Sequence, residues 1–105
     1  MQTPIHTRSV RAIAERLLKT QHALGLNQRQ LCARAGIATN TYNQWVKAKG
    51  RPDLDEAFKL CDAFGLTLDW IYFGDPSGLP HALAIKLFGP PNNPPAPTPR
   101  TGTGG

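Results

Sequence analysis

Residues 39–48 place five polar side chains on one face of a predicted helix. At about 100° per residue, an arc of about 140° contains these side chains: Thr39, Asn43, Lys47, Asn40 and Gln44. Asn and Gln carry a donor and an acceptor in one plane, which matches the N6/N7 edge of adenine. Lysine can reach guanine acceptors or a phosphate. This face therefore has the chemistry to read the edges of base pairs.

The rest of this segment supports the same interpretation. The other side of the helix is apolar and can pack against a core, since it carries Tyr42, Trp45 and Val46. Lys47, Lys49 and Arg51 form a basic run suited to the phosphate backbone of a duplex. The alternative is a polar surface helix whose charge is accidental. An ordinary solvated face would mix Glu with Lys, however, and this one has no acid.

Apolar periodicity predicts five or six short helices and no strand, hence an all-α fold. The first, third, fifth and sixth predicted helices span about residues 9–23, 39–48, 68–73 and 80–88. The second begins at the Asn27 cap and ends at Gly36, and the fourth begins at Asp53 and Glu56 and ends at Gly65. Thr67 is the predicted cap of the fifth. We expect the fourth of these to bury Leu54, Ala57, Phe58, Cys61 and Phe64. Trp70, Ile71 and Phe73 are expected in the core. A last apolar group could dock on the preceding helix or form a dimer surface: Leu79, Leu83, Leu87 and Phe88.

Composition narrows the class of protein. The 105 residues carry a net charge of +5. Residues 1–51 hold nine Lys/Arg and one acid, whereas residues 52–105 hold three Lys/Arg and six acids. The positive charge thus lies in the same half as the polar helix, which favours an anionic partner. No apolar run approaches the roughly 20 residues of a membrane span, and no signal peptide is evident.

Catalytic, metal and cofactor sites are not evident. We expect Cys32 and Cys61 to be small buried thiols of a reduced, cytoplasmic protein. The three histidines are too scattered to build a zinc site with these cysteines. Ser9 and Ser77 are the only serines, and neither belongs to a nucleophile–base set. We expect no enzyme activity, no cofactor and no small-molecule ligand.

The chain divides into three parts. Residues 9–74 form the predicted DNA-binding domain, residues 75–88 a short helical extension, and residues 89–105 a tail. Six of the ten prolines lie in residues 90–99, and the last five residues are only Thr and Gly. Such a composition cannot build a core, so we expect a disordered tail. A proline-rich ligand for a partner domain is the alternative.

Residues 13–74 resemble the Cro and phage-repressor type of helix-turn-helix domain, the xenobiotic-response-element-like family. The matching residues are Asn27-Gln28-Arg29-Gln30-Leu31-Cys32, Gly36-Ile37-Ala38, the helix up to Trp45, Arg51-Pro52-Asp53-Leu54, Leu60-Cys61-Asp62-Ala63-Phe64-Gly65-Leu66, and Leu68-Asp69-Trp70-Ile71. The resemblance implies a compact five-helix, lambda-repressor-like domain. It also implies gene regulation, commonly by a homodimer on a pseudo-palindromic DNA operator.

The resemblance also assigns roles to residues. It implies that Gln28 contacts a phosphate and braces the third helix. It also implies that Thr39, Asn40 and Gln44 contact the edges of bases. It implies a core of Leu31, Ile37, Tyr42, Trp45, Leu60, Phe64 and Ile71. The candidate DNA contacts are therefore Gln28, Thr39, Asn40, Thr41, Asn43, Gln44, Lys47, Lys49 and Arg51.

Three departures from the family pattern affect this assignment. Ala38 stands where a capping Ser or Thr is usual, which weakens the helix start by about 1 kcal/mol. Tyr42 and Trp45 are larger than the usual aliphatic residues, so the core must be repacked. Val46 replaces an acid that pairs with the first-helix arginine, so Arg16 is expected to lack that partner.

Two functions from different classes remain at this stage. The first is a transcriptional regulator, a repressor that inserts residues 39–48 into the major groove of double-stranded DNA. The alternative is a protein-interaction module on the same fold, antitoxin-like or an assembly factor. The basic, acid-free face favours DNA.

Deleting residues 90–105 should leave the melting temperature and DNA binding nearly unchanged, because this composition adds no packed core. Thermal denaturation of the full and truncated chains measures this directly. A clear drop in melting temperature would show that the tail docks on the domain.

Overall fold

The computed structural model describes residues 9–89, and this part of the chain is all-α without a strand. Its elements are α2 (Val10–Ala23), α3 (Gln28–Ala35), α4 (Thr39–Val46), α5 (Leu54–Phe64), the π-helical turn η1 (Asp69–Phe73) and α6 (His81–Phe88). The all-α expectation is confirmed. None of these helices is long and apolar enough to cross a membrane. The predicted tail lies outside the described residues except for Gly89.

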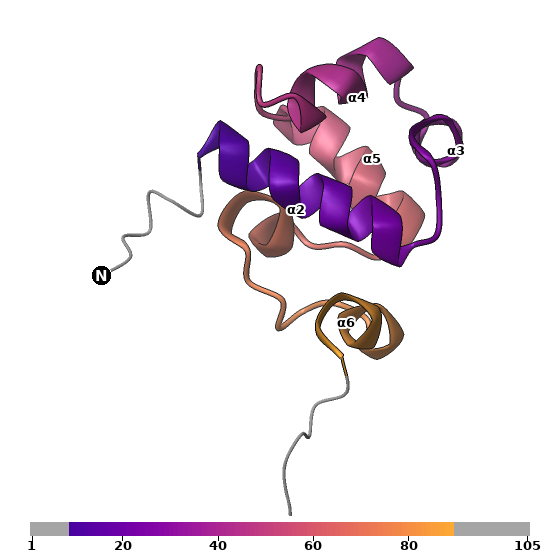
Figure 1. The fold of residues 1–105 in the computed structure, drawn as a ribbon, viewed down its shortest axis with the longest axis vertical. Helices are drawn as coiled ribbons and strands as arrows, with labels where there is room; N and C mark the ends of the chain where they lie inside the picture. Colours follow the sequence, from indigo (N-terminus) through magenta and orange to yellow (C-terminus); the bar gives the residue numbers. More distant parts are fainter. Residues whose placement is uncertain (1–8, 90–105) are drawn as a thin grey trace, which may run out of the picture.

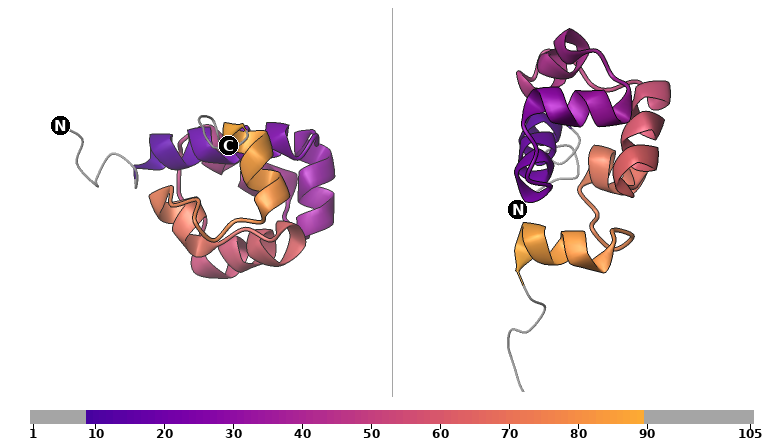
Figure 2. Two further views of the ribbon diagram at one scale, coloured as in Figure 1. Left: turned by 90° about the horizontal axis from the view of Figure 1, so that it is seen from below. Right: turned by 90° about the vertical axis from the view of Figure 1, so that its right-hand side faces the viewer.

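Helix α2 runs through the middle of the molecule, and the other elements pack around it. It contacts α4, η1 and α6, while α3 packs against α4 and α5. Figure 1 shows α4 at one end of the long axis and α6 at the other, with α5 behind α2. The side view in Figure 2 shows the same separation of α4 from α6. The helix predicted to read bases therefore lies far from the C-terminal extension.

Side-chain caps fix most of the helix starts: the sequence predicts those of Asn27, Asp53 and Thr67, and the structure adds Ser9. The Ser9 hydroxyl accepts a hydrogen bond from the Ala12 N–H at 3.0 Å, and the Thr67 hydroxyl accepts one from the Trp70 N–H at 3.0 Å. Asp53 accepts from the Glu56 N–H at 2.9 Å. The Glu56 carboxylate pairs with Lys59 at 3.3 Å. The bond from the Glu56 N–H to Asp53 is therefore the side-chain cap of this helix start.

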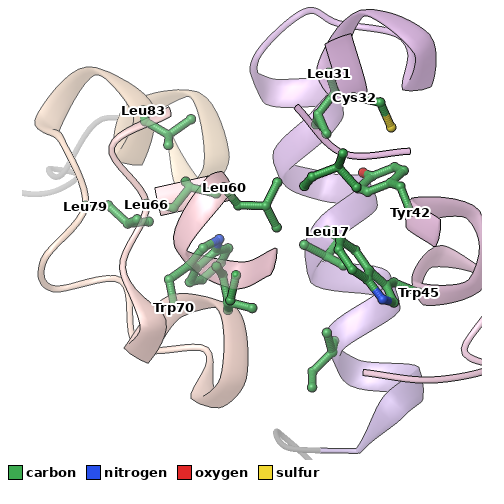
Figure 3. Packing of buried hydrophobic residues seen from close by; sticks show 14 of the residues in the cluster. Leu17, Leu31, Cys32, Tyr42, Trp45, Leu60, Leu66, Trp70, Leu79 and Leu83 are labelled. Atoms are coloured by element: carbon green, nitrogen blue, oxygen red, sulfur yellow. The ribbon is translucent and has the colours of Figure 1, made fainter. Parts of the chain in front are cut away.

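The core joins the buried faces of all these elements (Figure 3). Six of the seven core positions implied by the family resemblance are buried: Leu31, Ile37, Tyr42, Trp45, Leu60 and Ile71. Phe64, the seventh, is only partly buried and packs against this cluster. Trp70 is also buried, at 4% exposed, as expected. Tyr42 and Trp45 of α4, which are larger than the usual aliphatic residues, are thus accommodated by packing against α2 beside Trp70 of η1.

Three residues expected in the core lie at the surface instead. Leu54 is 52% exposed, Phe58 45% and Phe73 50%. Helix α5 buries Ala57 and Leu60 most deeply, so Leu54 and Phe58 fall at the edge of its apolar arc. Sequence periodicity finds the arc but cannot tell which part of it the neighbouring helices cover.

The C-terminal extension belongs to the fold. Leu79, Leu83 and Leu87 are buried, and α6 docks on α2. The exposed Phe88 ring meets the Trp70 ring edge-on at 5.7 Å, and Lys19 Nζ lies 4.3 Å from its centre. Of the two alternatives left open by the sequence, docking within the chain therefore accounts for the three leucines.

Arg16 bonds to other groups, since Val46 stands where the family has the acid that would pair with it. Its Nη2 donates to the Ile71 carbonyl at 3.0 Å, and its guanidinium lies 5.9 Å from the centre of the Trp70 ring. Burial lowers the pKa of Arg16. Gly74 closes η1 with φ +77°, and a Cβ there would lie 3.0 Å from Arg16 Nη1. The arginine thus ties the end of η1 to α2, and the left-handed φ of Gly74 favours glycine beside it.

Thr20→Val should lower the free energy of unfolding by about 1–3 kcal/mol, because it leaves a buried indole N–H without an acceptor. The Thr20 hydroxyl accepts from Trp70 Nε1 at 3.0 Å and donates to the Arg16 carbonyl at 2.7 Å. Thermal or urea denaturation measures the loss. In a Trp70→Phe background the same substitution should cost clearly less, since the donor is gone. An equal cost in both backgrounds would contradict this role.

Candidate nucleic-acid interface

Helices α3 and α4 are joined by a tight turn at Gly36–Ala38. Asn27 starts α3 with a full capping box, in which its side chain and that of Gln30 bond each other's backbone N–H groups at 2.8 and 2.9 Å. Gly36 ends α3 in the left-handed region at φ +74°, where glycine is favoured. Ile37 then turns into the core, at 5% exposed. The next helix begins three residues after Gly36.

The buried side of α4 is fixed to α2. Tyr42 is fully buried, and its hydroxyl donates to Gln21 Oε1 at 2.9 Å. Burial raises the pKa of Tyr42, so the hydroxyl stays protonated and remains a donor. Its ring meets Trp45 edge-on at 5.9 Å. Sequence reasoning missed Gln21, although its position four residues after Leu17 on the inner face of α2 was available as a signal.

Two side chains, the partly buried Gln28 and the exposed Lys59, bond to backbone carbonyls of the turn and of the start of α4. Gln28 Nε2 donates to the Thr39 carbonyl at 3.4 Å, and Lys59 Nζ donates to the Gly36 carbonyl at 3.4 Å. Ala38 supplies no side-chain cap to α4, as the sequence predicts. Gln28 therefore ties α3 to the first turn of α4, whose N–H groups receive no side-chain cap. Lys59 of α5 was not singled out by the sequence, which carries no local signal for it.

The predicted contact residues reach the surface to different degrees. Four of the five on the arc are exposed: Thr39, Asn40, Gln44 and Lys47. Asn43, the fifth, is partly buried. Thr41 is also partly buried and lies off the arc, on the side of α4 that carries Trp45. The arc is thus a continuous polar face backed by the buried aromatic side.

Helix α4 ends earlier than the sequence predicts. Its last residue is Val46, and the expected end at Ala48 is corrected by two residues. The Ala48 N–H bonds the Trp45 carbonyl at 3.0 Å, and the Lys49 N–H bonds the Gln44 carbonyl at 2.8 Å. This is a Schellman ending with alanine at the left-handed position, at φ +60°. It directs the chain through Lys49 and Arg51, both exposed, beside the end of α4.

A family model described as helix-turn-helix (HTH_3) matches residues 11–71. The chain belongs to the helix-turn-helix family. Membership of this Cro/C1-type family implies DNA binding. No curated protein and no solved structure matches the chain.

The charge of the helix-turn-helix segment suits a polyanion. Residues 27–51 carry no acid, and all five of their cations are exposed: Arg29, Arg34, Lys47, Lys49 and Arg51. Exposed cations next to a duplex displace condensed counterions and supply affinity that does not depend on sequence. The polar arc, in contrast, offers amides and a hydroxyl that can discriminate bases. One segment therefore carries both kinds of contact.

The two cysteines of the helix-turn-helix domain differ in burial. Cys32 is buried against the core, and burial raises the pKa of its thiol. Cys61 is partly buried, less than expected. Within residues 9–89, no group of three or more His, Cys, Asp or Glu side chains is placed to hold a metal ion.

Ala48→Gly should raise the free energy of unfolding by about 1 kcal/mol, because glycine adopts the left-handed region without strain from a Cβ. Thermal denaturation measures the change. Ala33→Gly is the control: Ala33 is exposed inside α3, so glycine there should lower stability by about 1 kcal/mol. Destabilisation by both substitutions would refute the account of the α4 ending.

Proposed function

We propose that this chain is a small, non-enzymatic transcriptional repressor of the cytoplasm that binds double-stranded DNA at a specific sequence. Residues 39–48 enter the major groove, with α4 as the reading element. The observation that carries the proposal is the polar, acid-free arc of α4, which is backed by a side fixed to α2 through Tyr42 and Gln21. An aliphatic or acidic arc would have favoured a protein partner.

The proposed contacts divide into two kinds. Thr39, Asn40 and Gln44 have short side chains on the exposed arc, so they meet base edges when α4 lies in the groove. Lys49 and Arg51 lie beyond the end of α4 and meet the phosphate backbone. The remaining members of the set support these two groups: Gln28 at the helix start, with Thr41, Asn43 and Lys47 along α4.

The proposed operator is pseudo-palindromic and binds two copies of the chain, one per half-site. A twofold operator matches a twofold protein pair, and the half-sites lie about one helical turn apart. Neither a cofactor nor a small-molecule ligand enters this proposal.

Gln44→Ala should cost about 1–3 kcal/mol of binding free energy on the preferred site and relax the preference at one base pair. Lys49→Ala should weaken binding to all sequences alike and reduce the log–log salt slope by about 0.9. The measurements are affinities for a site selected from random duplex DNA and for unrelated DNA, over a range of salt concentrations.

Trp45→Ala is the structural control for this pair. It removes a side chain that is 4% exposed, so it should cost about 3–5 kcal/mol of stability and abolish binding by unfolding. Gln44→Ala and Lys49→Ala alter exposed residues and should keep the wild-type melting temperature. If Gln44→Ala keeps full sequence preference while Lys49→Ala changes it, the proposed docking of α4 is wrong. A flat salt response of the wild type would refute DNA binding itself.

A further inference from the structure

Helix α6 carries a second, largely apolar stripe besides the leucines that pack on α2. Four of its residues follow one another at i, i+3, i+4 and i+7 and therefore share one face: His81, Ala84, Ile85 and Phe88. Phe88 is 52% exposed, and Ala84 and Ile85 are partly exposed. The family model ends at residue 71, before α6 begins, so this stripe lies outside the matched domain.

The stripe lines a groove together with the segment that joins η1 to α6. Pro76 and Ser77 of this segment line the groove, and so does Gly89 at the end of α6. The groove has a volume of about 290 Å³, close to the lower limit of roughly 300 Å³ for small-molecule pockets. The Ser77 N–H donates to Asp75 Oδ1 at 2.9 Å, and the N–H of the buried Leu79 donates to the Pro76 carbonyl at 3.0 Å. These bonds hold the segment in shape, so the groove is formed without a ligand.

The charges beside the groove favour an anion at the end where Phe88 lies. Lys19 of α2 is exposed, and its Nζ lies 4.3 Å from the centre of the Phe88 ring. No described carboxylate lies within ion-pair distance of Lys19. No Asp or Glu of residues 9–89 lines the groove, and Asp75, the acid next to Pro76, already accepts the Ser77 N–H. A carboxylate near Phe88 would therefore meet an ammonium that has no counter-charge, whereas a cation there would be repelled.

The length of the stripe indicates the shape of the ligand. At 1.5 Å per residue, the stripe runs about 10 Å along α6 from His81 to Phe88. An extended acyl chain matches such a narrow apolar path. Figure 1 shows α6 at the end of the molecule opposite α4, so a ligand in the groove leaves the proposed DNA surface free.

We propose that the groove between α6 and residues 76–77 binds one medium-chain fatty acid. Its acyl chain lies along Ile85 and Ala84 and faces Pro76, and its carboxylate lies beside Phe88 as the counter-charge of Lys19. This site goes beyond the proposed function, and it departs from the expectation, based on sequence, that the chain takes no small-molecule ligand.

Three ligands with the same alkyl chain test the charge of the head group: decanoate, decanol and decylammonium. Each is added to the full chain below its micelle concentration. Isothermal titration calorimetry should give one decanoate per chain, with about tenfold higher affinity than decanol and a larger margin over decylammonium. Decanoate should also raise the melting temperature, because it binds the folded chain.

Lysine substitutions test the carboxylate contact. Lys19→Gln should reduce the affinity for decanoate about tenfold and leave the affinity for decanol unchanged. Lys86→Gln is the matched control, because Lys86 is exposed on α6 but lies off the stripe. It should leave both affinities unchanged.

Groove substitutions test where the acyl chain lies. Ala84→Leu places a larger side chain in the groove without removing a core contact, and it should reduce the affinities for decanoate and decanol about tenfold. Phe88→Ser should do the same. Phe73→Ser is its control, since Phe73 is 50% exposed on η1 and outside the groove. Melting temperatures show whether each variant keeps the fold.

Four results would overturn the inference. Two are equal affinities for decanoate and decylammonium, and unchanged binding of decanoate by Ala84→Leu. A gain of about tenfold in affinity on deletion of residues 90–105 would make the tail the occupant. A dimer that decanoate dissociates during sedimentation would make a second copy the occupant. None of these measurements contains DNA, so their outcome is independent of the proposed function.

Discussion

The position of α4 depends on one buried hydrogen bond, from the Tyr42 hydroxyl to the Gln21 side chain at 2.9 Å. A buried hydroxyl without a partner is costly, so this bond favours one placement of α4 along α2. Trp45 packs beside Tyr42 and holds the same face inward. With that side fixed, the exposed arc must carry Thr39, Asn40 and Gln44. The surface that we propose for DNA is thus set by contacts on its opposite side.

Helix α2 connects this face to the rest of the molecule. Gln21 holds α4, while Thr20 and Arg16 bond η1 at the Trp70 indole and the Ile71 carbonyl. The C-terminal extension then packs on α2 and on the Trp70 ring through Phe88. Polar groups of one helix therefore satisfy buried donors and acceptors from elements on both sides of it, which makes the small core specific as well as apolar.

The packing of the core leaves two surfaces of different chemistry, one on the helix-turn-helix segment and one at the edge of α5. The helix-turn-helix segment shows cations and amides, because its apolar residues are used by the core. The edge of α5 shows Leu54 and Phe58, because the inner positions Ala57 and Leu60 already fill the space against the core. The first surface suits a polyanion, whereas the second leaves two apolar side chains in solvent.

Much of this arrangement was determined by local sequence. Caps such as Asn27, the stop at Gly36 and the polar arc of residues 39–48 depend on interactions within a few residues, which a sequence displays directly. The family match over residues 11–71 agrees with that interpretation. The limits of a local signal are visible at Ala48, where a helix-forming residue takes a left-handed ending that the helical pattern does not foretell.

Only the tertiary structure decided which apolar residues are covered and which distant groups pair. Periodicity predicts that Leu54 and Phe58 lie in the core, and the large ring of Phe73 predicts the same for that residue, yet about half of each lies in solvent because no described element covers them. Periodicity left the leucines of α6 undecided, yet they are buried on α2. The bonds of Gln21 with Tyr42 and of Lys59 with Gly36 span 21 and 23 residues. Such pairs depend on how helices cross, which is a property of the whole packed core and not of any one segment.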